Sequence, residues 1–306
     1  MRVLVTGASG FVGAHLLPEL RSAGHEPVVV GIDAANLLPG VPGAVADLRN
    51  AASTLAAVES LAPDGCIHLA AQAHVPTSWN KPAETMDVNV TGTLHLLEAF
   101  RRHRPAARIL FISTAEVYGR REGAELVSED APLSPESIYG ISKAAADMTA
   151  RAYARHHGMA VVVARPQNHI GPGQAPIFAA ASFAAQIAAL LRDPALPRRL
   201  LVGNLHSERD FADVRDVVHA YRLLLERGTP GRAYNIGSGR NRRVSELLDA
   251  LCHAAGIQPE RIRHEPYFRP TETPAVLDTR RILTELAWKP AIPFEQTVRD
   301  ILAAAR

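Results

Sequence analysis

The sequence predicts an α/β protein with a doubly wound parallel sheet, followed by a smaller C-terminal α/β lobe. Strand-like apolar runs alternate with helical patterns through the first two thirds of the 306 residues. A glycine-rich turn joins the first strand to the first helix, and after residue 165 prolines punctuate shorter elements. Such alternation gives parallel strands joined by right-handed helical crossovers. We therefore expect a larger domain over residues 1–165, to which some later segments return, and a smaller lobe over residues 166–306.

Each expected element follows from the periodicity of its residues. Short apolar runs predict strands over 3–6, 28–32, 66–69, 109–113 and 161–165. Patterns with a helical period predict helices over 11–23, 53–61, 82–103 and 139–157. In the lobe we expect helices over 178–190, 213–226 and 244–255, with a strand over 233–236. The stretch 178–190 is rich in Ala and Leu, which are strong helix formers.

The turn after the first strand carries Gly7, Gly10 and Gly13, a spacing that lets the backbone approach a pyrophosphate group. The phosphates then lie at the N-terminus of the following helix, where N–H groups and the helix dipole favour an anion. Asp33 stands twenty residues beyond Gly13, where an acid can accept a hydrogen bond from the adenosine ribose. These features predict that the first 165 residues form a dinucleotide-binding Rossmann domain.

A second motif places Tyr139 and Lys143 one helical turn apart, on the same face. The strand over 109–113 ends beside Thr114, at the carboxyl edge where open α/β sheets bind ligands. There Thr114 can hydrogen-bond a substrate carbonyl oxygen, Tyr139 can exchange a proton with it, and Lys143 can lower the pKa of the phenol. We therefore predict a dehydrogenase in which a nicotinamide supplies the hydride and these three residues are catalytic.

The composition narrows the class of protein further. Hydrophobic residues make up 47% of the chain and charged residues 21%, which excludes a disordered chain. No apolar run approaches the length of a membrane span, and no secretory signal is visible, so we expect a cytoplasmic protein that binds no membrane. A net charge of +2 gives no argument for nucleic acid. The two cysteines lack metal-ligand spacing, so we expect no metal.

Four segments resemble the extended short-chain dehydrogenase/reductases that act on nucleotide sugars. They are TGASGFVG at 6–13, HLAAQ at 68–72, STAEVYG at 113–119 and YGISK at 139–143. Four later segments most resemble the GDP-4-keto-6-deoxy-mannose reductases and the related GDP-mannose 4,6-dehydratases. They are RPQNHIGPGQ at 165–174, VGNL at 202–205, RDFADVRD at 209–216 and RPTE at 269–272. The resemblance spans essentially the whole chain and implies a nucleotide-diphosphate sugar, GDP-linked, as substrate.

The resemblance also implies individual site residues. For the cofactor they are Gly7, Ser9, Gly10, Phe11, Val12, Gly13, Asp33, Asp47, Leu48, Leu69, Ala70, Ala71, Gln72, Asn89, Tyr139, Lys143 and Arg165. For the substrate they are His74, Asn168, Val202, Asn204, Arg209, Arg269 and Glu272. Within this set the family places the two lobe arginines on the diphosphate and the glutamate on the ribose. Arginine suits bidentate phosphate contacts, and a carboxylate can accept hydrogen bonds from both ribose hydroxyls.

Three activities remain open, and Glu116 and Ala115 bear on the choice between them. A 4,6-dehydratase needs a base, for which Glu116 qualifies as a fourth catalytic candidate, and usually an acid beside it. This chain has Ala115 where dehydratases of the family carry Asp or Ser, which favours a C4 keto reductase. A 4-epimerase uses the same three catalytic residues and stays an alternative. A non-catalytic redox sensor is the remote one, because such relatives usually lose the tyrosine or lysine.

The cofactor form and the assembly state complete the expectations. Asp33 would repel a 2′-phosphate, and no Lys or Arg lies between Arg21 and Arg49 to bind one, so NAD(H) is favoured and NADP(H) remains possible. The family forms dimers through the helices over 82–103 and 139–157, which implies a homodimer. Leu94, Leu97 and Ala99, with Ala144, Ala145 and Met148, supply apolar side chains on those helices.

Overall fold

The computed structural model describes residues 1–120, 126–264 and 275–305. Seven parallel strands form the main sheet in the order β11-β6-β5-β4-β1-β2-β3. Their bounds are β1 (Arg2–Thr6), β2 (Glu26–Gly31), β3 (Gly43–Val45), β4 (Gly65–His68), β5 (Arg108–Ile112), β6 (Ala160–Pro166) and β11 (Ala233–Ile236). From β1 the chain adds β2 and β3 on one side of the sheet. It then returns to add β4, β5 and β6 on the other side of β1. The predicted doubly wound parallel sheet is confirmed.

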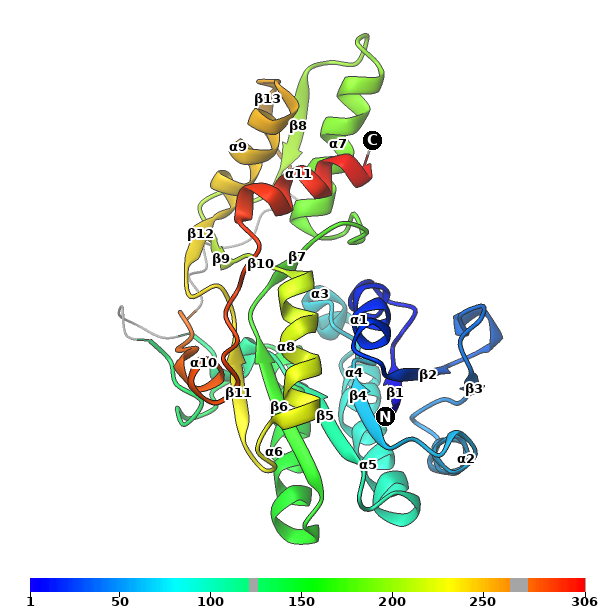
Figure 1. Ribbon diagram of the computed structural model, residues 1–306. Helices are drawn as coiled ribbons and strands as arrows, with labels where there is room; N and C mark the ends of the chain where they lie inside the picture. Colours follow the sequence, from blue (N-terminus) through cyan, green and yellow to red (C-terminus); the bar gives the residue numbers. More distant parts are fainter. Residues whose placement is uncertain (121–125, 265–274, 306) are drawn as a thin grey trace.

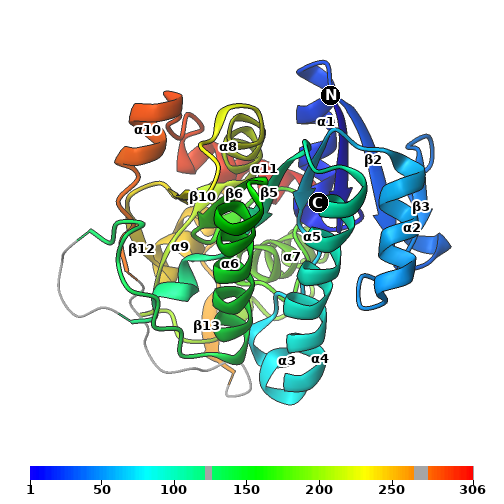
Figure 2. The same cartoon turned by 90° about the horizontal axis from the view of Figure 1, so that it is seen from below.

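Helices cover both faces of this sheet (Figure 2). On one face lie α1 (Phe11–Ser22) and α8 (Val214–Arg227), whose leucines and valines pack on β1, β4 and β5. On the other face lie α2 (Ala51–Leu61), α5 (Gly92–His103) and α6 (Ile138–His157). Both cores are mainly aliphatic and almost fully buried, as strands covered on two sides require. Two later segments, α8 and β11, return to this domain.

The expected single helix over 82–103 is interrupted. The chain forms α4 (Pro82–Met86), then a π-helical turn over Asp87–Thr91, and only then α5. A short helix, α3 (Val75–Asn80), precedes them, and α10 (Arg280–Leu286) packs near β11. A π-helical turn inserts one extra residue per turn and is frequent at functional sites. The interruption centres on Asn89, which is buried.

The smaller lobe stands over the carboxyl edge of the main sheet (Figure 1). Its core joins α7 (Ala179–Arg192), α9 (Val244–Ala255) and α11 (Phe294–Ala305) with β8 (Arg199–Val202). Three two-stranded pairs complete it. They are β8 with β13 (Glu260–Arg263), β9 (Glu208–Asp210) with β12 (Asn241–Arg243), and β7 (His169–Ile170) with β10 (Ala212–Asp213). Within the described ranges, no helix combines the length and apolarity that crossing a membrane requires.

Candidate active site

The glycine turn between β1 and α1 forms a tight cradle. Gly7 has a φ of +68°, and a Cβ on it would lie 2.8 Å from the backbone nitrogen of Ala70. A Cβ on Gly13 would lie 2.2 Å from the carbonyl oxygen of Ala8. Gly10 caps α1, and no side chain caps the first N–H groups of that helix. The cradle therefore fits a group with phosphate oxygens, which backbone N–H groups at a helix N-terminus can bind.

The loop that follows β4 lies against this cradle. The loop begins with Leu69, Ala70, Ala71 and Gln72. The N–H of Ala70 donates to the hydroxyl oxygen of Thr6 at 3.1 Å. Asn89 holds the end of the loop, because its Oδ1 accepts from the N–H of Gln72 at 2.8 Å and its Nδ2 donates to the carbonyl of Gln72 at 3.0 Å. The structure thus brings the predicted cofactor residues of 7–13, 69–72 and 89 to one edge of the sheet.

The predicted adenosine end of the cofactor site is more exposed. Asp33 lies two residues beyond β2, and its Oδ1 accepts from the N–H of Asn36 at 3.0 Å. Asp47 pairs with Arg49, with 2.7 Å between Oδ2 and Nη2, and this bond lowers the pKa of Asp47. Leu48 follows, and its carbonyl accepts from His95 at 2.9 Å. All three predicted residues therefore lie near the carboxyl ends of β2 and β3.

Arg165 differs from the rest of the predicted cofactor set in that its side chain is paired within the protein. Its side chain is 1% exposed and forms two bonds with Asp147, at 2.8 and 3.0 Å. One terminal nitrogen also donates to the hydroxyl of Tyr118 and the carbonyl of Glu129, each at 2.9 Å. Burying a guanidinium requires such pairing, so the side chain holds β6 to α6 instead of reaching a ligand. The position of Arg165 at the start of the segment 165–174 did not predict this internal pairing.

The three catalytic candidates come together at the carboxyl end of β5. Thr114 begins a 3₁₀ turn there, and its hydroxyl is near enough to the Tyr139 phenol, in the first turn of α6, to lower the pKa of that phenol. Lys143 lies one turn further along α6, with its ammonium 4.5 Å from the centre of the Phe111 ring. Ser137 caps α6 by accepting from the N–H of Gly140 at 2.9 Å. The helix start therefore fixes both the phenol and the ammonium relative to the sheet edge.

The electrostatics of the phenol differ from the expectation that Lys143 lowers its pKa. Burial and the nearby Glu116 carboxylate raise the pKa of Tyr139, and the hydrogen bond from Thr114 only partly opposes this rise. Burial lowers the pKa of Lys143 to about 7, against the opposing charge of Asp147. The physical reason is desolvation, which penalises the charged form of each group. Tyr139 consequently keeps its proton at neutral pH, where it can act as an acid.

Several residues that support the site carried no sequence signal of their own. Ser78 of α3 accepts from the N–H of Tyr139 at 3.2 Å, and Ser137 donates to Glu116 at 3.2 Å. Ser113, which follows β5 and precedes Thr114, is buried, and its hydroxyl has no hydrogen-bond partner among the described residues. An orphaned buried hydroxyl at this edge fits a site whose remaining polar partner belongs to a ligand.

Five of the predicted substrate residues lie within the described parts of the chain. His74 begins α3, and its ring meets Phe178 edge-on, with 6.3 Å between ring centres, across the two parts of the chain. Asn168 is exposed between β6 and β7. Val202 ends β8, Asn204 follows it, and Arg209 lies half-buried on β9. Arg269 and Glu272 lie outside the described residues.

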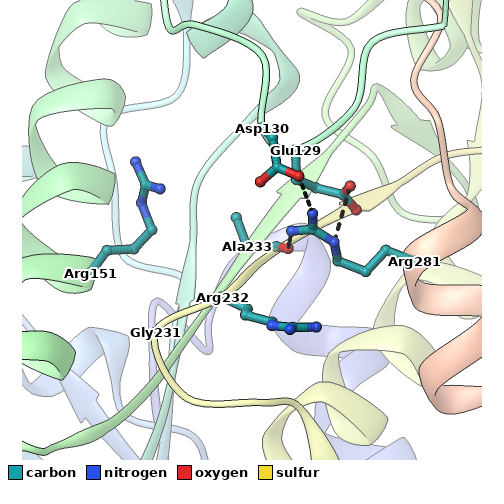
Figure 3. A pocket seen from close by; sticks show the side chains of 7 residues that line it. All are labelled: Glu129, Asp130, Arg151, Gly231, Arg232, Ala233 and Arg281. Carbon is teal, nitrogen blue, oxygen red and sulfur yellow. Dashed lines mark hydrogen bonds and ion pairs between the residues drawn. The ribbon is translucent and has the colours of Figure 1, made fainter.

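A cavity of about 260 Å³ lies elsewhere, at the β11 edge of the sheet (Figure 3). Arg281 crosses it, donates to Asp130 at 2.6 Å and to the carbonyl of Ala233 at 3.0 Å, and pairs with Glu129 at 3.4 Å. Its α6 wall is Arg151, which is twelve residues, or about 18 Å, along the helix from Tyr139. The cavity is therefore separate from the catalytic edge.

In the described part of the chain, no group of three His, Cys, Asp or Glu residues could hold a metal ion.

Comparison with known proteins agrees with this geometry. The sequence pattern of the family described as GDP-mannose 4,6 dehydratase matches residues 4–301. The chain belongs to this family. A GDP-6-deoxy-D-mannose reductase of Pseudomonas aeruginosa is 38% identical over 99% of this chain and 96% of its own length. A dTDP-glucose 4,6-dehydratase of Streptomyces niveus is 34% identical over 96% of this chain and 89% of its own.

Solved structures of the same extended short-chain dehydrogenase/reductase class superpose closely. The P. aeruginosa RMD structure complexed with NADPH has a TM-score of 0.88 at 35% identity and covers 99% of this chain and 98% of that one. A Thermus thermophilus UDP-glucose 4-epimerase complexed with NAD has a TM-score of 0.88 at 31% identity and covers 100% and 99%. The predicted resemblance, enzyme class and nicotinamide dinucleotide are thereby confirmed for this family member.

Proposed function

We propose that this family member reduces the C4 keto group of a nucleotide-diphosphate 4-keto-6-deoxy sugar, with GDP as the favoured nucleotide. The observation that carries this proposal is the Tyr139 phenol, protonated at neutral pH and placed by the first turn of α6 near Thr114 at the carboxyl end of β5. A ketone reduction needs one acid beside the carbonyl oxygen and nothing more from the protein's proton chemistry. The P. aeruginosa reductase, at 38% identity over nearly the full length, supports the choice of a GDP-linked sugar.

The chain's own residues have distinct tasks in this reaction. Thr114 and Tyr139 orient the carbonyl by hydrogen bonds to its oxygen, and Tyr139 then gives its proton to that oxygen as negative charge develops. Lys143 supplies positive charge near the phenol as it loses its proton. The nicotinamide, when bound, supplies the hydride, and residues 7–13, 69–72 and Asn89 would hold the dinucleotide. Water is limited at this edge because Lys143 is 4% and Thr114 9% exposed.

Ala115 argues against dehydration. It lies beside Thr114 in the 3₁₀ turn and offers no proton to a departing C6 hydroxyl. Glu116, the only carboxylate in that turn, accepts a hydrogen bond from Ser137 at 3.2 Å and raises the pKa of Tyr139. We infer that Glu116 tunes the acid and does not act as the base of an elimination.

An epimerase is the second candidate, favoured by the T. thermophilus UDP-glucose 4-epimerase at TM-score 0.88. The experiment that separates the two supplies GDP-, dTDP- and UDP-linked 4-keto-6-deoxy sugars with reduced cofactor, and the matching 4-hydroxy sugars with oxidised cofactor. A reductase consumes one reduced cofactor per keto sugar, whereas an epimerase interconverts the two C4 epimers of the hydroxy sugar with no net change in cofactor. Interconversion of the C4 epimers without net cofactor change would overturn the reductase proposal, and consumption with only the dTDP or UDP keto sugar would overturn the GDP assignment alone.

For substrate binding we propose residues of the lobe together with His74 at the start of α3. Arg209 and Arg269 bind the diphosphate, Glu272 binds the ribose, and Val202, Asn204, Asn168 and His74 line the sugar and base sites. The half-buried position of Arg209 on β9 supports this, since a partly desolvated guanidinium binds phosphate more strongly than an exposed one. For the cofactor we propose NAD(H), because the exposed Asp33 carboxylate beyond β2 would repel the 2′-phosphate of NADP(H). Its Oδ1 accepts a hydrogen bond from the N–H of Asn36 in the same turn.

We also propose a homodimer through α5 and α6, which lie side by side (Figure 2). Leu94, Ile141 and Met148 on these helices are 37, 41 and 57% exposed. Leu97, Ala99 and Ala144, which the sequence also suggested, are instead buried in the chain's own cores. An exposed apolar face of this kind is typical of an interface. Sedimentation at micromolar concentration tests it, and Met148→Glu should produce monomers; a wild-type monomer would contradict the proposal.

A further inference from the structure

A chain of hydrogen bonds runs through the protein interior beneath the cofactor loop. Thr6, His68, Thr93 and Asn89 are 0, 2, 2 and 1% exposed. The Thr6 hydroxyl lies 2.7 Å from Nδ1 of His68, and Nε2 of His68 lies 3.1 Å from the Thr93 hydroxyl. That hydroxyl donates in turn to the carbonyl of Asn89 at 2.7 Å. Four polar side chains thus occupy positions where apolar ones would cost less to bury.

The direction of each bond follows from the proton inventory. Thr93 gives its single hydroxyl proton to Asn89, so its oxygen must accept from His68 Nε2–H. A neutral imidazole then accepts at Nδ1, and the donor is the Thr6 hydroxyl. Burial and the charge of Lys143 lower the pKa of His68 to about 3, so the ring is neutral. One tautomer therefore satisfies the whole chain.

The two ends of this chain are parts of the candidate active site. At one end the Thr6 hydroxyl oxygen accepts from the N–H of Ala70, in the loop against which Gly7 packs. At the other end Asn89 bonds both backbone groups of Gln72 and donates from Nδ2 to the hydroxyl of Ser142 at 2.9 Å.

Ser142 carries the connection into α6, because its hydroxyl donates to the carbonyl of Tyr139 at 2.7 Å. Asn89 lies in the π-helical turn, which is where α4 and α5 fail to form one regular helix. The irregular turn presents the Asn89 carbonyl to Thr93 and its side chain to both the loop and α6. The chain from Thr6 to Asn89 therefore spans the two segments that must be aligned for hydride and proton to reach one carbonyl.

We propose that His68, together with Thr6 and Thr93, is a positioning group that holds the cofactor loop 69–72 in register with the helix carrying Tyr139 and Lys143. None of the three is assigned a contact with substrate or cofactor; they act through Ala70 and Asn89. The proposal rests on the proposed function for its kinetic consequence, but its effect on cofactor binding is independent of which sugar is reduced. Misplacing such groups by about 1 Å can cost about a hundredfold in rate.

The chain offers a matched control for the test. Thr297 of α11 is 1% exposed, and its hydroxyl donates to Oδ2 of Asp213 at 2.7 Å and to the carbonyl of Pro293, four residues back, at 3.4 Å. Thr93→Val removes the hydroxyl and keeps the shape, Thr93→Ser keeps the hydroxyl, and Thr297→Val makes the same change away from the cofactor loop and α6. Melting temperature, cofactor Kd, kcat and the KM for the sugar nucleotide are measured for all three.

Thr93→Val should raise the cofactor Kd about tenfold, a modest share of the cost of an unpaired buried donor. It should lower kcat by ten- to a hundredfold, with the KM for the sugar nucleotide changed by less than about twofold. Thr93→Ser should restore most of both values. Thr297→Val should lower the melting temperature without changing the cofactor Kd or kcat.

His68→Gln and His68→Leu give a second, independent comparison. Glutamine can still donate to Thr93 and should keep part of the cofactor affinity, whereas leucine should lose as much as Thr93→Val. The proposal is overturned if Thr93→Val matches the wild type, if Thr93→Ser is equally impaired, or if Thr297→Val shows the same kinetic loss. A wild type that binds cofactor but reduces none of the sugars would overturn the proposed function. The cofactor Kd values of the variants would still test the positioning role of His68, Thr6 and Thr93.

Discussion

The two halves of the candidate site are built in different ways. At the sheet edge, Lys143 and Asn89 are at most 4% exposed and lie among buried hydrogen bonds that link β1, β4, the π-helical turn and α6. In the lobe, Asn168 is exposed, Arg209 is half-buried, and the strands pair only two by two. Proton and hydride transfer require fixed geometry, whereas recognition of a flexible nucleotide sugar requires accessible groups that can close on it. Under the proposed function, proton and hydride transfer take place in the closely packed half, and the lobe selects the substrate.

The sharpest test of the closely packed half is Tyr139→Phe. It removes the only proton donor assigned to the carbonyl, so we expect kcat to fall by at least about a hundredfold, the usual scale for a positioned acid. Cofactor affinity should stay near the wild-type value. Tyr153→Phe is the matched control, because Tyr153 lies on the same helix but bonds Glu98 at 2.7 Å. Near wild-type turnover of Tyr139→Phe would end the proton-donor assignment.

The corresponding test of the lobe is Arg209→Ala. Loss of a charge-assisted contact to phosphate should raise the KM for the sugar nucleotide about ten- to a hundredfold, with much less change in kcat. The same change at Arg269 is expected to act alike. Arg243→Ala on the adjacent strand β12 is the control, since that side chain is 62% exposed. If KM stayed constant in both variants, the lobe would not hold the diphosphate through these arginines.

A pH profile tests the electrostatics of the closely packed half. The pKa of Lys143 is lowered to about 7, so its ammonium is present below that pH and lost above it. We expect kcat/KM to decline as pH rises through about 7, by up to about tenfold per pH unit, because the phenol loses its positive neighbour. Lys143→Arg keeps the charge at all these pH values and should flatten the decline. Superimposable profiles of the two proteins would contradict this role.

The smallest expected effect concerns the cofactor's adenosine end. Asp33→Ala should narrow the ratio of kcat/KM for NADH over NADPH by roughly tenfold, since a carboxylate near the ribose repels a 2′-phosphate. Asp47→Ala is the comparison, because that carboxylate is already paired with Arg49. A wild type that strongly prefers NADPH would remove the premise. The measurement is informative because the similar P. aeruginosa structure is complexed with NADPH, whereas NAD(H) is proposed for this chain.

The sequence alone determined the sheet, the glycine cradle and the Tyr139/Lys143 pair. These features are local: a glycine needed for a close backbone approach, or two side chains four residues apart on a helix, can be recognised from spacing. Strand alternation likewise predicted which edge would carry Thr114, because parallel strands share their carboxyl ends. The resemblance of whole motifs then extended the prediction to the sugar-nucleotide substrate.

Only the tertiary structure showed which polar side chains form hydrogen bonds with other side chains inside the protein. Arg165 pairs with Asp147, eighteen residues away in sequence, and His68 bonds Thr93, twenty-five residues away. The pKa of Tyr139 likewise depends on burial and on Glu116, which reaches it from another element. Desolvation and hydrogen bonding between distant segments set these properties, and neither is encoded in residue spacing. The sequence identified the reacting groups, and the packing around them determines their protonation and alignment.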